Sequence, residues 1–339
     1  MKIVKYISSL FAIALLFAAC DKKEVELDFR PAAGMAQFQL HYMVPVTSGV
    51  STEYIYRVDI NDVNISNDQW SISTYNGQPG SNVGEFFVAQ PGKNNIKLYQ
   101  RVSSKDTLVY NQDATFTSGT QTVIVYDFHQ PPIVTEWNVP ENTGKSYDTD
   151  TIGYIKFHNL MFETPAVPKT EDAPEIPAVP TTLKLQYQFR YILHPLYTIA
   201  DEMAGTIPEG KKVGNYTGDT KKSKWANLGP ALAFGENTGW VKVPVKKSEY
   251  VTSGYATIDY RILVVEGGTV GVEKNADGIL LACATGKTTP TSYGTIGDTG
   301  DNSERGDYWT LYVGRAHQHF FAGARAGLPG CGVRTFGAR

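Results

Sequence analysis

The sequence lacks a large excess of positive or negative charge, because its 31 Lys and Arg residues nearly balance its 34 Asp and Glu residues. Without a dominant basic patch, nucleic acid is not expected as a partner. The sequence also lacks the G-x-S-x-G, H-E-x-x-H, phosphate-loop and dinucleotide-binding motifs, so it does not indicate the enzyme classes that carry them. We therefore predict a chain that is not an enzyme and that has no cofactor and no metal centre.

A membrane-spanning apolar run is lacking as well. The apolar run from Ile7 to Ala19 would be roughly 20 Å long as a helix, against the ~30 Å of a bilayer core. Lys2 and Lys5 precede the run and small residues end it, which is typical of a signal peptide. The sequence therefore predicts a signal peptide over residues 1–19.

The end of that run predicts a lipid anchor. The segment Leu16-Phe17-Ala18-Ala19-Cys20 resembles the lipobox of bacterial lipoproteins, although Phe17 stands where Leu is usual. In such proteins the cysteine thiol takes a diacylglyceryl group and becomes the mature N-terminus. We expect lipidation at Cys20, a tether over residues 20–33, and an outer membrane lipoprotein on the periplasmic or cell-surface side.

Only two cysteines remain beyond Cys20, namely Cys283 and Cys331. An exported protein meets an oxidising compartment, where such a pair can form a disulfide. Closing a loop of this size would stabilise the fold by about 4 kcal/mol. The alternative is two separate buried thiols, and the sequence leaves both open.

Helical periodicity is nearly absent, and period-two alternation takes its place. In "TLKLQYQFRYI" (182–192) and "YATIDYRILVV" (255–265), apolar and polar residues alternate as in half-buried strands. Only residues 196–205 suggest a short helix. Ten further strands are expected over 36–44, 54–60, 84–89, 95–102, 106–110, 120–128, 152–159, 239–245, 277–284 and 307–313. Short strands without crossover helices predict antiparallel β-sandwiches.

The alternating segments fall into two halves that resemble diverged copies. We expect a first sandwich over 34–138, a linker over 139–150 and a second sandwich over 151–339 that carries loop insertions. "AQFQLHYMVP" would correspond to "GYIKFHNLMF", and "TVIVYDF" to "WTLYVGR". A proline-rich insertion over 163–181 is expected as an exposed loop, and the tail over 314–339 as an irregular segment packed on the second domain.

Three short motifs resemble a Bacteroidota family of tandem Ig-like lipoproteins of unknown function. They are Lys156-Phe157-His158-Asn159, Val58-Asp59-Ile60-Asn61-Asp62, and Pro91-Gly92 before "KNNIKLY". The resemblance implies an all-β fold of two tandem antiparallel Ig-like sandwiches on a lipid tether, and it implies no catalytic residues.

Candidate binding residues are aromatic, because glycan sites combine an aromatic platform with polar groups at its edge. Thr107 and Thr151 lie in Asp-Thr-Leu and Asp-Thr-Ile triplets that fit an O-glycosylation pattern. His317 and His319 could share an ion on a strand, and the acidic loop 298–307 could hold calcium, but surface positions are expected for both. The candidate aromatics are Trp70, Tyr75, Trp225 and Trp240.

Three functions remain open at this point. The first is a non-enzymatic envelope lipoprotein that binds a partner of unknown identity through its sandwich loops. The second is a surface glycan-binding protein of a polysaccharide-uptake system. The third is a fimbrillin-like structural subunit, for which Arg30 offers a cleavage position.

Overall fold

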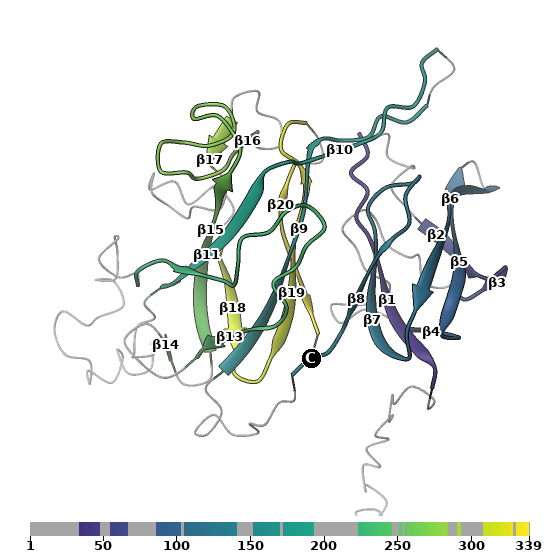
Figure 1. Ribbon diagram of the computed structural model, residues 1–339, viewed down its shortest axis with the longest axis horizontal. Helices are drawn as coiled ribbons and strands as arrows, with labels where there is room; N and C mark the ends of the chain where they lie inside the picture. Colours follow the sequence, from purple (N-terminus) through teal and green to yellow (C-terminus); the bar gives the residue numbers. More distant parts are fainter. Residues whose placement is uncertain are drawn as a thin grey trace, which may run out of the picture. The chain divides into compact units, whose positions relative to one another are not determined.

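The computed structural model describes residues 34–47, 55–66, 86–102, 105–140, 152–169, 172–192, 223–245, 251–252, 255–283, 290–292, 308–327 and 330–338. Over these residues the chain is all-β, with strands grouped in several mainly antiparallel sheets and no helix (Figure 1). The predicted all-β sandwich class is therefore confirmed. The helix expected over 196–205 and most of the linker over 139–150 lie outside the described residues.

Two sheets are built from the first part of the chain. One has the strand order β4-β1-β7-β8 and the other the order β3-β2-β5-β6. Their bounds are β1 Ala36–Tyr42, β2 Ile55–Ile60, β3 Val63–Asn64, β4 Phe87–Ala89, β5 Gly92–Val102, β6 Lys105–Phe116, β7 Gly119–Val125 and β8 Ile133–Glu136. The two sheets bury a common core that includes Phe38, Leu98 and Phe116.

Two larger sheets come from the second part. One has the order β10-β9-β19-β20 with β13 also paired to β9, and the other has the order β12-β11-β15-β14 with β18 paired to β15. Their bounds, with those of a separate β16-β17 ribbon, are β9 Ile152–Thr164, β10 Val179–Pro180, β11 Lys184–Ile192, β12 Ala226–Asn227, β13 Val241–Pro244, β14 Val251–Thr252, β15 Tyr255–Glu266, β16 Leu281–Cys283, β17 Pro290–Ser292, β18 Tyr308–Tyr312, β19 Ala316–Ala324 and β20 Gly332–Gly337.

The alternation predicted over 182–192 is confirmed in β11. Leu185, Tyr187 and Phe189 are buried in the core between these two sheets, whereas Gln188 and Arg190 remain partly exposed on the other face. Because successive side chains of a strand point to opposite faces, one face of β11 is available for contacts outside the core.

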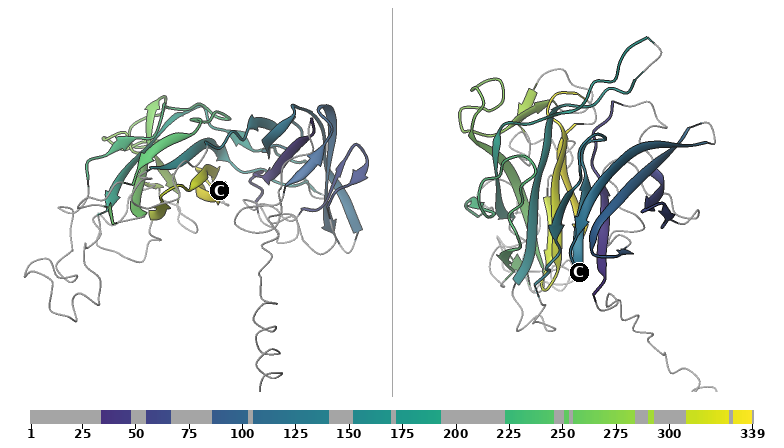
Figure 2. Two further views of the ribbon diagram at one scale, coloured as in Figure 1. Left: turned by 90° about the horizontal axis from the view of Figure 1, so that it is seen from below. Right: turned by 45° about the vertical axis from the view of Figure 1, so that its right-hand side comes forward.

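Strands β1 and β9 depart from the half-buried pattern. All seven residues of β1 are buried, and eight consecutive residues of β9 are as well. Met43 and Ile124 pack with Leu160, Phe320 and Ala322, which joins the β1-β7 sheet to the β9-β19 sheet. These two sheets therefore form the inner layers of the stack, as the views in Figure 2 show.

Polar side chains also lie in this middle layer. Gln318 Nε2 donates to Thr122 Oγ1 at 3.3 Å, and Gln318 Oε1 lies 3.0 Å from His158 Nε2. Lys156 Nζ donates to the backbone carbonyl of Glu136 at 2.7 Å. Burial lowers the pKa of Lys156 to about 8. Polar contacts thus accompany the apolar packing between the inner sheets.

The two pairs of sheets share a strand order. β1 lies between an antiparallel strand and the parallel strand β7, and β9 likewise lies between β13 and the parallel strand β19. The expected match of the segments that contain β1 and β9 agrees with this order. The expected match of "TVIVYDF" with "WTLYVGR" is wrong, because β7 corresponds to β19, whereas "WTLYVGR" contains β18.

The expectation that the tail over 314–339 is an irregular segment is also wrong. It forms β19 and β20, and β19 pairs with β9 over its full length from Ala316 to Ala324. Eight of the nine residues of β19 are buried, and the seven from 318 to 324 are buried without a break. The stretch 320–324 is continuously apolar and lacks the alternation on which the strand predictions rested.

The Val58–Asp62 motif forms a tight hairpin turn. Asn61 and Asp62 have φ values of 51° and 66°, and a two-residue type I′ turn requires positive φ at both of its central residues. Asn61 Oδ1 accepts a hydrogen bond from the backbone N–H of Asn95 at 2.8 Å. Its Nδ2 donates to Asn94 Oδ1 at 2.9 Å. The asparagine therefore fixes the β2-β3 turn against β5.

Candidate functional site

The proline-rich insertion forms an arm between β9 and β10. Val167 and Ile176 exchange backbone hydrogen bonds of 2.8 and 2.9 Å, so the two sides of the arm pair with each other. At its root, the N–H of Ala166 donates to Pro45 O at 2.7 Å, and the N–H of Thr47 donates to Ala166 O at 2.8 Å. The arm is therefore attached to the segment that follows β1.

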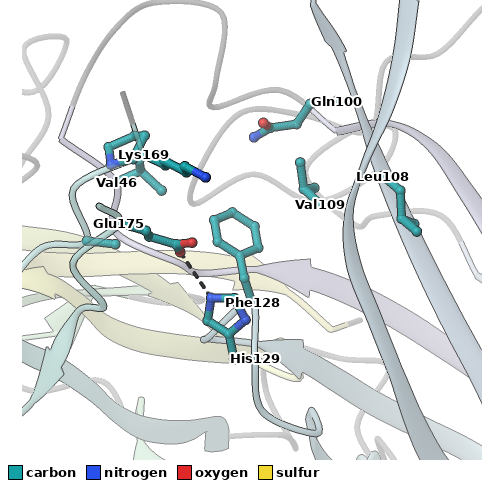
Figure 3. Close-up of a pocket in the computed structure, with 10 residues that line it drawn as sticks. Val46, Gln100, Leu108, Val109, Phe128, His129, Lys169 and Glu175 are labelled. Carbon is teal, nitrogen blue, oxygen red and sulfur yellow. Dashed lines mark hydrogen bonds and ion pairs between the residues drawn. The ribbon is translucent and has the colours of Figure 1, made fainter. Parts of the chain in front are cut away.

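A second contact holds the arm farther along. Glu175 Oε1 lies 3.1 Å from Nε2 of His129, a residue of the β7-β8 connection. Between this pair and the root of the arm lies an open hollow of about 330 Å³ (Figure 3). Its apolar lining includes Leu108, Val109 and Phe128, and its polar lining includes Gln100 and Lys169. None of these residues was a candidate from sequence, and Lys169 meets the others only through the arm.

A second candidate surface lies on the outer face of the β11-β15 sheet, around Trp225. The guanidinium carbons of Arg190 and Arg261 lie 4.3 and 4.5 Å from the centre of the Trp225 ring. Arg190 Nε donates to Asp259 Oδ2 at 2.7 Å, and Arg261 Nε donates to Gln188 Oε1 at 2.8 Å. Both arginines are thereby fixed, and they hold the half-buried indole over the sheet.

Polar side chains lie close to the Trp225 ring. Gln188 Nε2 donates to Oδ1 of the exposed Asn227 at 2.7 Å, and Asn227 lies two residues after Trp225 on the same edge. Both arginines project from the sheet face that also carries Gln188, so guanidinium and amide groups lie beside the indole ring. The arrangement brings one of the four predicted aromatics together with amide and guanidinium groups.

Trp240 has a different environment. Its Nε1–H donates to the backbone carbonyl of Trp137 at 2.6 Å, and the side chain is half-buried. Trp137 in turn makes an edge contact with Phe86, with ring centroids 5.2 Å apart. The polar edge of Trp240 is thus engaged inside the protein. Trp70, Tyr75, Cys20, Thr151 and the acidic loop 298–307 lie outside the described residues.

The structure describes the side chains of two further predicted positions, Thr107 and Cys331. Thr107 is exposed on β6, as an acceptor of a sugar would have to be. Cys331 is buried, whereas the side chain of Cys283 falls outside the described part of the chain. The disulfide between them stays a prediction.

The expectation of surface positions is wrong for His319, whereas His317 is half-buried. Both lie in β19, where His319 is fully buried and its Nδ1 lies 3.3 Å from the hydroxyl of Tyr187. Burial lowers the pKa of both imidazoles. Within the described ranges, no group of three or more His, Cys, Asp or Glu side chains is arranged to hold a metal ion.

Comparisons with known proteins leave the family open. No family model and no curated protein matches the chain. In the part of the chain that the structure describes, no helix has the length and hydropathy to cross a bilayer.

Proposed function

We propose that the chain is a non-enzymatic outer membrane lipoprotein that binds glycans through the surface around Trp225. The observation that carries this proposal is the indole ring held by Arg190 and Arg261 on the outer face of the β11-β15 sheet. The resemblance to tandem Ig-like lipoproteins supports the same setting, with Cys20 as the lipid anchor.

The chemistry of sugars suits such a surface. The C–H groups on one face of a pyranose pack on an aromatic ring, while its hydroxyls take hydrogen bonds from amides and guanidinium groups. Because Arg190 is fixed by Asp259, little side-chain freedom would be lost on binding. A rigid platform with polar edges is what recognition of a polysaccharide chain needs.

Affinity gel electrophoresis across a panel of polysaccharides tests the proposal with the purified full-length protein. We expect at least one polysaccharide to retard the protein, and Trp225→Ala to abolish the retardation. Tyr99→Ala is the matched control, because Arg57 stacks on Tyr99 at 4.8 Å in another sheet. Absence of retardation in every gel, or an equal loss in the control, would contradict the proposal.

A further inference from the structure

The hollow beneath the proline-rich arm contains an unsatisfied hydrogen-bond donor. Gln100 is only 5% exposed, and among the described residues its Nε2 has no hydrogen-bond partner. Buried amide donors nearly always have an acceptor, because leaving one unpaired costs free energy. Gln100 lines the hollow, so an acceptor of a bound molecule could occupy this position.

A positive charge lies at the same hollow. Lys169, on the arm, is exposed and makes no ion pair with any residue that the structure describes. Among the lining residues that the structure describes, the one acidic side chain is Glu175, and it is already engaged by His129 at 3.1 Å. Figure 3 shows Gln100 and Lys169 reaching toward the same space from different sides. Two donors, one of them charged, favour an anionic acceptor.

The remaining walls are apolar. Phe128 packs against Tyr42 with ring centroids 6.0 Å apart, and it presents its ring to the hollow between Gln100 and Lys169 (Figure 3). Val109 is half-buried beside it, and Leu108 is 46% exposed. A volume of about 330 Å³ has room for one amino-acid side chain or one sugar ring.

We propose that this hollow is a second binding site, separate from the Trp225 surface, and that it takes a carboxylate carried on an apolar group. The carboxylate accepts hydrogen bonds from Gln100 and Lys169, and the apolar group packs on Phe128. Two sources offer this chemistry: the C-terminal residue of a peptide and a uronic acid, whose ring has an apolar face.

Titrations by saturation-transfer NMR on the full-length protein test the proposal. The probes are N-acetyl-L-phenylalanine with its neutral amide, and methyl β-D-glucuronide with methyl β-D-glucoside. We expect one carboxylate probe to bind at least about tenfold more tightly than its neutral partner, as a charge-assisted contact gives. The pair that shows this difference identifies the source. Failure of both carboxylates to bind, or equal binding of the neutral forms, would overturn the proposal.

Two variants locate the site. Lys169→Gln and Gln100→Leu should each weaken the bound carboxylate about tenfold. Lys242→Gln changes an exposed lysine of β13 and should leave binding unchanged. Thermal unfolding shows whether each variant is folded. If Gln100→Leu does not fold, Lys169→Gln alone tests the site, because it changes an exposed position. If Lys169→Gln binds the carboxylate as tightly as the unsubstituted protein, the assignment of this site is overturned, whether or not Trp225→Ala abolishes glycan binding.

Discussion

The imidazole of His158 stacks on the phenyl ring of Phe320, with ring centroids 4.4 Å apart and planes 11° apart. The two residues are direct partners in the parallel pairing of β9 with β19. His41 of β1 reaches the same phenyl ring at 4.8 Å from the neighbouring sheet. Phe320 therefore contacts a histidine of each inner sheet, and both histidines are almost completely buried.

Burial makes these histidines sensitive to acid. The pKa of His41 is lowered to about 3, chiefly by desolvation, and the pKa of His158 is lowered well below its ordinary value for the same reason. In the unfolded chain both imidazoles would take up a proton below about pH 6.5. The folded state excludes that proton, so the free energy of unfolding falls as the pH drops below this value.

We predict that His41→Leu stabilises the protein and reduces this acid sensitivity. Among the described residues neither ring nitrogen of His41 has a hydrogen-bond partner, so an apolar side chain of similar volume fits better. The slope of unfolding free energy against pH between 6 and 5 should fall by up to about 1.4 kcal/mol per pH unit. Urea denaturation at several pH values measures it.

The control for this prediction is a residue that carries no ionisable group. Because His129 pairs with Glu175, the non-titratable Leu40 of β1 is used instead: it is 1% exposed, and Leu40→Ala should leave the slope between pH 6 and 5 nearly unchanged. If His41→Leu has the slope of the unsubstituted protein, the histidine is not excluded from protonation in the fold, and the prediction is wrong.

Alternation in the sequence predicted the outer strands well and the inner ones less completely. β11 and β15 have one face in a core and one outside it, so their polar and apolar residues sort by period two. β19 is buried on both faces because a second sheet covers it, and its run of apolar residues carries no such signal. The stacking of inner sheets is a tertiary relationship that periodicity does not encode.

The candidate sites were predictable only where an aromatic residue marked them. Trp225 was a candidate from composition alone, but its arginine partners lie 35 and 36 residues away in the chain and meet it through strand pairing. Gln100 and Lys169 gave no signal, because the arm that unites them is a proline-rich segment without periodicity.

We predict that Gly323→Ala is strongly destabilising. Gly323 has φ +108°, and an added Cβ would lie 2.5 Å from the carbonyl oxygen of Gly330 and 2.7 Å from Cys331 Cα. Because these are backbone atoms, the clash cannot be relieved by a side-chain rotation, and we expect a loss of about 3 kcal/mol or more. Chemical denaturation measures the difference.

Gly119→Ala separates backbone strain from the steric clash as causes of the destabilisation. Gly119 also has a positive φ, +96°, but nothing lies within 4 Å of an added Cβ. Backbone strain alone should then cost about 1–2 kcal/mol. Equal losses in the two variants would show that close approach of β19 and the Gly330 segment is not the cause.

We predict that Cys20→Ser abolishes lipidation of the protein. A serine cannot take the thioether-linked diacylglyceryl group, so the anchor would not form. Metabolic labelling with palmitate should label the unsubstituted full-length protein and leave Cys20→Ser unlabelled. Equal labelling of the two would contradict lipidation at this cysteine.

We predict that breaking the ion pair between Arg190 and Asp259, beneath Trp225, destabilises the protein. The side chain of Asp259 is 0% exposed and that of Arg190 is 12% exposed, with Nε 2.7 Å from Oδ2. Removing one partner leaves a buried charge, so Arg190→Met should cost about 3–5 kcal/mol. Replacing both, in Arg190→Met with Asp259→Leu, removes that charge and should recover most of the loss. Urea denaturation of the two variants measures the difference. A double variant no more stable than the single one would mean that lost packing around Trp225, and not the buried carboxylate, dominates the cost.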